Sequence, residues 1–232
     1  MNVDGRKGSS FNNVGILAND SMYVFVEVTV DPNGGNQPLL IQDSVLFTVN
    51  GIRQSVLLEA YGQDVNLYKG GVTITKDSIL TANRPYLIYD SLVIAKGVSL
   101  NIEKGATFYM HDKASLIVHG SMNALGTLDE PITFRGDRLD YILNDILPYD
   151  RTPGQWGGIT FKADSYGNVW DNVIVRNGTS GVYCELSTPD RPKIKINNSQ
   201  ITNMGSDLSS PSIVMLSLQI RNSAMPEEVY SL

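Results

Sequence analysis

The chain has 232 residues, of which 42% are hydrophobic and 18% are charged, a balance typical of a folded protein rather than a disordered one. Its net charge of −6 argues against a nucleic-acid phosphate backbone as a partner. Its single cysteine, Cys184, excludes an intrachain disulfide and a thiolate metal cluster. The sequence contains no run of about 18 apolar residues, so we predict no membrane-spanning segment, and from its polar first residues we expect no signal peptide in this chain.

The first part of the chain predicts antiparallel strands. Alternating apolar residues over 23–30 predict one strand, and two further alternating runs, 44–49 and 54–61, flank the pair Asn50-Gly51. An Asn-Gly pair between two such runs indicates a hairpin, because a type I′ turn needs positive φ at both central positions. Four or five strands are fewer than a complete immunoglobulin domain contains, so we predict a partial sandwich.

The rest of the chain contains short strands that recur. The sequence SLVI at 91–94 returns as SLIV at 115–118, a shift of 24 residues. The sequence ATF at 106–108 returns as ITF at 132–134 and again as ITF at 159–161, with shifts of 26 and 27. Repeats of 20 to 50 residues indicate solenoids or propellers, and this spacing fits one coil made of three short strands.

These patterns predict an all-β chain with two parts. Residues 1–65 are expected to form a partial antiparallel immunoglobulin-like β-sandwich, and residues 66–85 a connector. Residues 86–232 are expected to form a right-handed parallel β-helix of about five coils. Each coil cannot bury its inward side chains alone, whereas stacked coils about 4.8 Å apart share a continuous core.

One segment, residues 135–155, interrupts the repeat and concentrates charged and aromatic side chains. Insertions in a solenoid often lie on its binding face. The candidate ligand-binding residues in and beside this segment are Arg135, Asp137, Arg138, Asp140, Tyr141, Asp145, Tyr149, Asp150 and Trp156.

Three interpretations of this insertion are open. It is a capping loop whose charges pair with one another, a carbohydrate site whose aromatic rings stack on sugars, or a cation site whose carboxylates bind Ca²⁺. The carboxylates of the insertion do not have the spacing of a known Ca²⁺-binding loop, and the sequence implies no other cofactor. Trp156, directly before Gly157-Gly158, is also predicted to close the core where the insertion returns.

Catalytic signatures are weak throughout the sequence. His111 and His119 have no nucleophile or third metal ligand in register, so we expect them to be solvated or stacked. Cys184 follows a strand-like run with no base nearby, which favours a buried, inert thiol. We therefore predict no catalytic residues.

Four segments carry a resemblance to a known group of proteins. They are RPYLIYD at 84–90, GVSLNIEKGA at 97–106, FRGDR at 134–138 and GQWGGI at 154–159. They resemble cell-surface proteins of Bacteroides-type gut bacteria, which carry a pectin-lyase-like right-handed β-helix behind a small immunoglobulin-like domain and are largely uncharacterised.

The resemblance implies an extracellular or outer-surface location and a binding or structural role without evident catalysis. The expected partner is a polysaccharide or a surface protein. Two alternatives remain open. One is a polysaccharide lyase or glycoside hydrolase, for which Arg135, Arg138 and Arg176 are the nearest candidate cations. The other is an adhesin or assembly segment.

Overall fold

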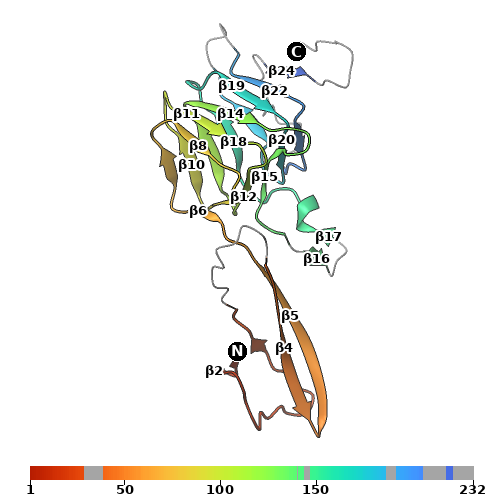
Figure 1. The fold of residues 1–232 in the computed structure, drawn as a ribbon. Coiled ribbons are helices and arrows are strands. Elements are labelled where there is room, and N and C mark those ends of the chain that lie inside the picture. The colour runs from red at the N-terminus through yellow and green to blue at the C-terminus, as the bar shows by residue number, and fades with distance from the viewer. Residues whose placement is uncertain (29–38, 140, 144–146, 187–191, 206–217, 222–232) are drawn as a thin grey trace. The chain divides into compact units, whose positions relative to one another are not determined.

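The computed structural model describes residues 1–28, 39–139, 141–143, 147–186, 192–205 and 218–221. The chain divides into two compact units, Met1–Asp64 and Val65–Leu232 (Figure 1). Both units consist of β-strands, and among the described residues the one helical element is a short 3-10 turn. The predicted all-β class is therefore confirmed. No helix in the described part of the chain is long and apolar enough to span a membrane.

The N-terminal unit contains two antiparallel sheets. Its strands are β1 (Asn2–Val3), β2 (Arg6–Lys7), β3 (Val24–Phe25), β4 (Leu39–Val49) and β5 (Ile52–Gly62). β1 pairs with β2 and β3, whereas β4 and β5 form a hairpin. Asn50 and Gly51 turn this hairpin with φ values of 49° and 77°, as a type I′ turn requires. The antiparallel character predicted here is confirmed. The strand predicted over 23–30 is shorter than expected, since among its described residues only Val24–Phe25 is a strand, and positions 29 and 30 lie outside the described residues.

The C-terminal unit is a parallel β-solenoid with three sheets. Sheet 1 contains β6 (Asn66–Tyr68), β9 (Tyr86–Ile88), β12 (Thr107–Met110), β15 (Ile132–Gly136), β20 (Val173–Arg176) and β23 (Gln200–Thr202). Sheet 2 contains β7 (Val72–Ile74), β10 (Ser91–Ile94), β13 (Ser115–Val118), β18 (Gly158–Phe161) and β21 (Val182–Cys184). Sheet 3 contains β8 (Ser78–Leu80), β11 (Ser99–Ile102), β14 (Ser121–Leu125), β19 (Asn168–Asp171), β22 (Ile194–Asn197) and β24 (Leu218–Arg221). Each coil visits the three sheets in turn, which confirms the predicted parallel β-helix.

Equivalent inward side chains stack from coil to coil. In sheet 1 the rings of Tyr86, Phe108 and Phe134 stack with centroid separations of 4.9 and 4.6 Å. Trp170 of sheet 3 lies 6.4 Å beyond Phe134 and is fully buried. Strands such as β10, β12 and β13 alternate half-buried and buried positions, so one side of each strand enters this core. The core is therefore continuous along the stack of coils.

The strand register confirms two of the predicted repeats and corrects the third. Ser91 pairs with Ser115 and Thr107 with Thr133, as the shifts of 24 and 26 indicate. Thr160, however, pairs with Ile117 in sheet 2 and not with Thr133 in sheet 1. The similarity of the two ITF sequences is therefore not a structural repeat, because the insertion displaces the following strands by most of a coil.

The solenoid also begins earlier than predicted. Strands β6, β7 and β8 lie in the segment expected to be a connector, residues 66–85. They pair in parallel with β9, β10 and β11 and form the first coil. Val72 lies 20 residues before its partner Leu92, a shorter shift than the 24 to 27 of the recognised repeats, so the period did not extend to this coil.

The insertion leaves the solenoid between sheet 1 and sheet 2, after β15. In the preceding coil only residues 111–114 separate the equivalent strands, β12 and β13. The insertion contains β16 (Tyr141–Leu143), β17 (Leu147–Pro148) and the 3-10 turn η1 (Tyr149–Arg151) (Figure 1). It returns through Trp156, which forms a parallel bridge with Gly178.

Candidate functional site

Asp150 holds the insertion against the outer face of sheet 1 by bridging two arginines. Its Oδ2 accepts a hydrogen bond from Arg176 Nη1 at 3.1 Å, and its Oδ1 lies 3.0 Å from Arg135 Nη2. The two arginines are neighbours on adjacent coils, because Phe134 pairs with Val175. Burial lowers the pKa of Arg135 from its ordinary value; the carboxylate of Asp150 opposes this effect, and the positive charge of Arg176 adds to it.

Two amide side chains fasten the same turn. Gln155 Nε2 donates hydrogen bonds to the carbonyl oxygens of Tyr149 and, at 2.7 Å, Thr152. Asn177, which is fully buried, donates from Nδ2 to the carbonyl oxygens of Asp150 at 2.7 Å and Thr152 at 3.1 Å. Both amides thus donate to the backbone carbonyl oxygens of one turn.

Trp156 is part of the core. Its side chain is 1% exposed, and its Nε1 donates a hydrogen bond to the carbonyl of Arg176 at 2.8 Å. The indole therefore closes the coil where the insertion returns, as the sequence predicts. The same burial keeps its ring from stacking on a ligand, so Trp156 does not serve as a binding residue in this structure.

Asp137 pairs with His111 of the preceding coil. Their Oδ2 and Nδ1 atoms are 2.6 Å apart. The ring centroids of His111 and Tyr89 are 4.1 Å apart, and Lys69 Nζ lies 5.5 Å from the centroid of the Tyr89 ring. A column of cation, aromatic ring, imidazole and carboxylate therefore runs along the corner that follows sheet 1. The prediction that His111 is stacked agrees with this arrangement.

The other predicted site residues belong to the outer part of the insertion. The guanidinium of Arg138 lies 4.0 Å from the centroid of the Tyr149 ring, a cation–π contact. Asp140 and Asp145 lie outside the described residues, and for Tyr141 the structure describes the backbone of β16 only. Arg135, Asp137 and Asp150 thus contact one another or ionisable residues of the solenoid, as the capping interpretation expects.

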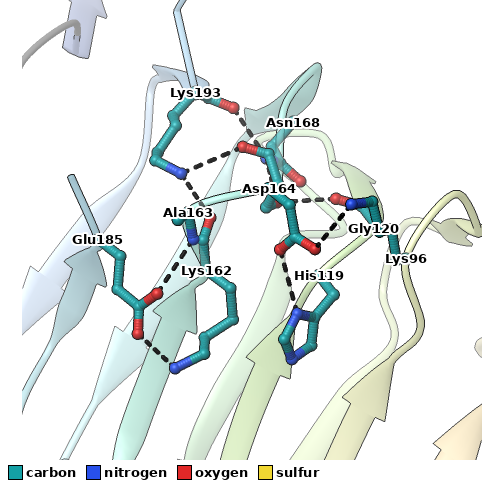
Figure 2. A network of polar contacts seen from close by, with 10 residues as sticks. Lys96, His119, Gly120, Lys162, Ala163, Asp164, Asn168, Glu185 and Lys193 are labelled. Carbon is teal, nitrogen blue, oxygen red and sulfur yellow. Dashed lines mark hydrogen bonds and ion pairs between the residues drawn. The ribbon is translucent and has the colours of Figure 1, made fainter. Parts of the chain in front are cut away.

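A second polar cluster lies at the corner between sheet 2 and sheet 3, and Figure 2 shows it from close by. Asp164 Oδ1 lies 3.1 Å from His119 Nδ1, and its Oδ2 lies 3.8 Å from Lys96 Nζ. Burial alone would raise the pKa of Asp164. The hydrogen bonds from His119 and from the backbone, with the charges of His119 and Lys96, outweigh burial and lower that pKa from its ordinary value of 3.8.

Three further charged residues complete this cluster (Figure 2). Lys162 forms an ion pair with Glu185, whose other oxygen accepts the backbone N–H of Ala163 at 3.0 Å. The hydrogen bond from Lys162 is the main reason that the pKa of Glu185 falls below its ordinary value. Lys193, 6% exposed, donates to the carbonyl of Lys162, and burial lowers the pKa of its ammonium group.

Asn168 ties three successive coils together beneath this corner. Its Oδ1 accepts the backbone N–H of Met122 at 2.7 Å, and its Nδ2 donates to the carbonyl of Lys193 at 2.8 Å and to Ser165 Oγ at 3.0 Å. Ser165 in turn donates to the carbonyl of Gly120 at 2.7 Å. Both Asn168 and Ser165 are buried, so the network satisfies polar groups inside the solenoid.

The sequence did not indicate that the residues of the second cluster lie together. The signal that identifies them is strand register: His119, Lys162 and Glu185 each follow the last residue of β13, β18 and β21, which are in register with one another. The equivalence of His119 and Lys162 is recognised only when the residues of the insertion between β13 and β18 are left out of the spacing.

The arrangement allows limited chemistry. In both histidine–aspartate pairs a carboxylate contacts Nδ1, which orients the imidazole and directs Nε2 away from the carboxylate. Such a histidine is suited to accept a proton from, or coordinate, a group placed at Nε2. Among the described residues, no group of three or more His, Cys, Asp or Glu side chains is arranged to hold a metal ion.

The comparisons with known proteins are sparse. No protein family and no solved structure matches the chain. A stretch of 104 residues is 31% identical to "Protein bark beetle" of Drosophila melanogaster. The match covers 43% of this chain and 3% of that protein, so the chain spans only a small part of the length of the relative it matches.

Proposed function

We propose that this chain is a cell-surface binding module without a catalytic role, in which the β-helix presents a glycan-recognising face on and beside sheet 1. The observation that carries the proposal is the set of half-buried aromatic rings at this face. Tyr109 lies on the outer side of β12, Tyr89 follows β9, and Tyr149 lies in η1. Aromatic faces of this kind stack on the apolar faces of sugar rings, and nearby polar groups bind hydroxyls.

The cations beside these rings support the same role. Lys69 contacts Tyr89, Arg138 contacts Tyr149, and Arg135 follows Tyr109 along the same outward column, because Tyr109 pairs with Arg135. Rigid aromatic groups flanked by hydrogen-bond donors favour a polar ligand with flat apolar faces. The location outside the cell rests on the resemblance to surface proteins of Bacteroides-type bacteria and is part of the proposal.

A glycan array with the full chain tests the proposal. We expect retention of a defined set of polysaccharides without turnover, and weaker retention when Tyr141 or Tyr149 is replaced by alanine. Tyr183→Ala is the matched control, because Tyr183 lies on the outer face of sheet 2 and is 36% exposed. Equal retention by the Tyr149 and Tyr183 variants would remove the insertion from the binding face. The absence of any retained glycan would contradict glycan recognition.

A polysaccharide lyase or glycoside hydrolase is the second candidate, and the two oriented histidines favour it. A lyase would release unsaturated uronides that absorb ultraviolet light, and a hydrolase would release reducing ends. If either product forms, and if His111→Ala or His119→Ala abolishes it without changing the melting temperature, the enzymatic interpretation replaces the binding one.

An adhesin or assembly role is favoured by a separate observation. In the N-terminal unit the hairpin β4–β5 exposes large apolar side chains, including Leu46, Val49 and Ile52, each at least 66% exposed. Exposed apolar surface of this kind is typical of interaction sites. Concentration-dependent mass in sedimentation experiments, without glycan binding, would favour this role.

A further inference from the structure

We propose that Arg135 and Arg176 form a binding site for a tetrahedral oxyanion, a sulfate or phosphate monoester, which exchanges with the carboxylate of Asp150. This inference rests on the proposed binding function in one respect: it gives the ligand of the same face a chemical class. The contacts of the two arginines are independent of glycan recognition.

The strand register places the two guanidinium groups together. Arg135 and Arg176 occupy equivalent outward positions on β15 and β20, which are neighbouring strands of sheet 1. Parallel strands lie about 4.8 Å apart, so two like charges are held closer than they would remain in solution. Such a pair needs a bridging anion, and Asp150 now supplies one.

Asp150 fits this position incompletely. Its contact with Arg176 is a hydrogen bond, but its buried Oδ1 accepts no hydrogen bond although Arg135 Nη2 is 3.0 Å away. The Nε atoms of Arg135 and Arg176 are also buried without hydrogen-bond partners. A guanidinium binds an oxyanion best through two parallel N–H groups, whereas each of these arginines offers Asp150 only one.

A tetrahedral oxyanion suits the pair better than a carboxylate does. A sulfate or phosphate ester presents three terminal oxygens, enough to engage the Nε and Nη groups of both arginines. The charge balance favours such an ion as well, since one carboxylate faces two guanidiniums. The nearby carboxylate of Asp137 is already hydrogen bonded to His111.

The pair is reachable from solvent. The side chains of Asp150 and Arg176 are 36% and 29% exposed, whereas that of Arg135 is 15% exposed. Besides the Asp150 bridge, Gln155 and Asn177 hold the same turn through hydrogen bonds to its backbone carbonyl oxygens, and these bonds do not involve the Asp150 carboxylate. That carboxylate can therefore move aside while the solenoid stays intact, and the incoming oxyanion replaces it as the bridge.

The test follows the arginine side chains of the full chain by NMR, with inorganic sulfate and inorganic phosphate as the two probes. Lysine variants at positions 135 and 176 assign the two Nε–H signals and keep the charge while removing the planar fork. We expect saturable shifts of both signals, and roughly tenfold tighter binding in Asp150→Asn, because the internal competitor is weakened. Arg176→Lys should lose most of the affinity, whereas Arg151→Gln, which removes an exposed cation of the same insertion, should bind like the wild type.

The outcomes are separable. Binding that Asp150→Asn does not tighten would overturn the exchange, and equal weakening by Arg176→Lys and Arg151→Gln would show diffuse attraction instead of a site. A melting curve for each variant separates loss of binding from loss of folding. The probe that binds more tightly identifies the ester class. Anion binding of the expected kind with an empty glycan array would refute glycan recognition and leave this site standing.

Discussion

The side chain of Gln155 occupies the space that a side chain at position 136 would need. A Cβ atom at Gly136 would lie 2.8 Å from Cδ and 2.9 Å from Cβ of Gln155. Gly136 stands in the inward column of sheet 1, in register with Met110. Gln155, near the end of the insertion, therefore fills the space beside Gly136, where the insertion begins.

Gly136→Ala is therefore expected to destabilise the solenoid. Gln155 cannot move aside without losing its hydrogen bonds to Tyr149 and Thr152, so we expect a loss of about 1–3 kcal/mol in the free energy of unfolding. Chemical denaturation measures it. Gly15→Ala is the control, because no atom lies within 4 Å of a Cβ at that position. Equal stability of the two variants would show that Gln155 does not fill this space.

Trp156→Ala should cost more. The substitution removes a fully buried indole and leaves the carbonyl of Arg176 without its donor. Large-to-small changes of this size in a core cost about 3–5 kcal/mol. Trp156→Phe keeps much of the volume and loses the hydrogen bond, so its melting temperature should lie between those of the wild type and Trp156→Ala. An unchanged melting temperature in Trp156→Ala would contradict the role in closing the coil.

Asn168→Ala tests the network between sheet 2 and sheet 3. It leaves the Met122 N–H buried without its acceptor, and an unsatisfied buried group of this kind costs about 1–3 kcal/mol. It also removes one of the two hydrogen bonds that the Lys193 carbonyl accepts, whereas the backbone N–H of residue 168 still donates the other. Hydrogen exchange should show faster exchange at Met122. Asn123→Ala is a suitable comparison, since Asn123 makes one exposed hydrogen bond, to Asn101. If both substitutions lower the free energy of unfolding by the same amount, the buried hydrogen bonds of Asn168 contribute no more to stability than the exposed one of Asn123.

The stability should fall in acid because of Asp164 and Glu185. Their pKa values lie below the ordinary values of 3.8 and 4.5, so the unfolded chain binds protons more readily than the folded one. The two carboxylates contribute fully to the free energy of unfolding when the pH is above these ordinary pKa values. This contribution is lost as the pH falls through the lower pKa values of the folded protein. Denaturation midpoints measured from neutral to acidic pH should decline less steeply in Asp164→Asn/Glu185→Gln. An equally steep decline would assign the acid sensitivity elsewhere.

Cys184 should react slowly in the folded protein. Burial raises the pKa of its thiol, and the charge of Lys193 opposes this only in part, so little thiolate is present at neutral pH. Labelling with iodoacetamide, followed by mass spectrometry, should be slow under native conditions and fast in denaturant. Rapid native labelling would mean that this end of sheet 2 opens readily.

The parallel solenoid could be predicted from the sequence because stacking imposes equal spacing on equivalent residues. Ser91 and Ser115 occupy the same position in successive coils and therefore show the period directly. The spacing fails as a guide where the chain leaves the stack. Because of the insertion after Gly136, Thr133 and Thr160 are separated by about the length of one coil in the sequence. They lie in different sheets, so this spacing does not mark equivalent positions.

The site was predictable only in part, for a related reason. The charged composition of the insertion indicated that its ions pair with one another, and Asp150 does bridge arginines. One partner, Arg176, lies 26 residues away on the next coil. The sequence suggested Arg176 only as a candidate cation for a lyase, and the strand register is what places it beside Arg135. The same holds for Lys193 and Lys162, whose contact spans 31 residues of sequence.

The register of the coils is the central claim, and disulfide formation between designed cysteine pairs tests it most directly. In a Cys184→Ser background, Thr107→Cys with Thr133→Cys and Ile117→Cys with Thr160→Cys place two cysteines opposite each other on neighbouring strands. Such positions lie about 4.8 Å apart, within the range that a disulfide spans. We expect both pairs to cross-link under mild oxidation, and Thr133→Cys with Thr160→Cys to remain reduced. Cross-linking of that third pair in place of the first two would contradict the account.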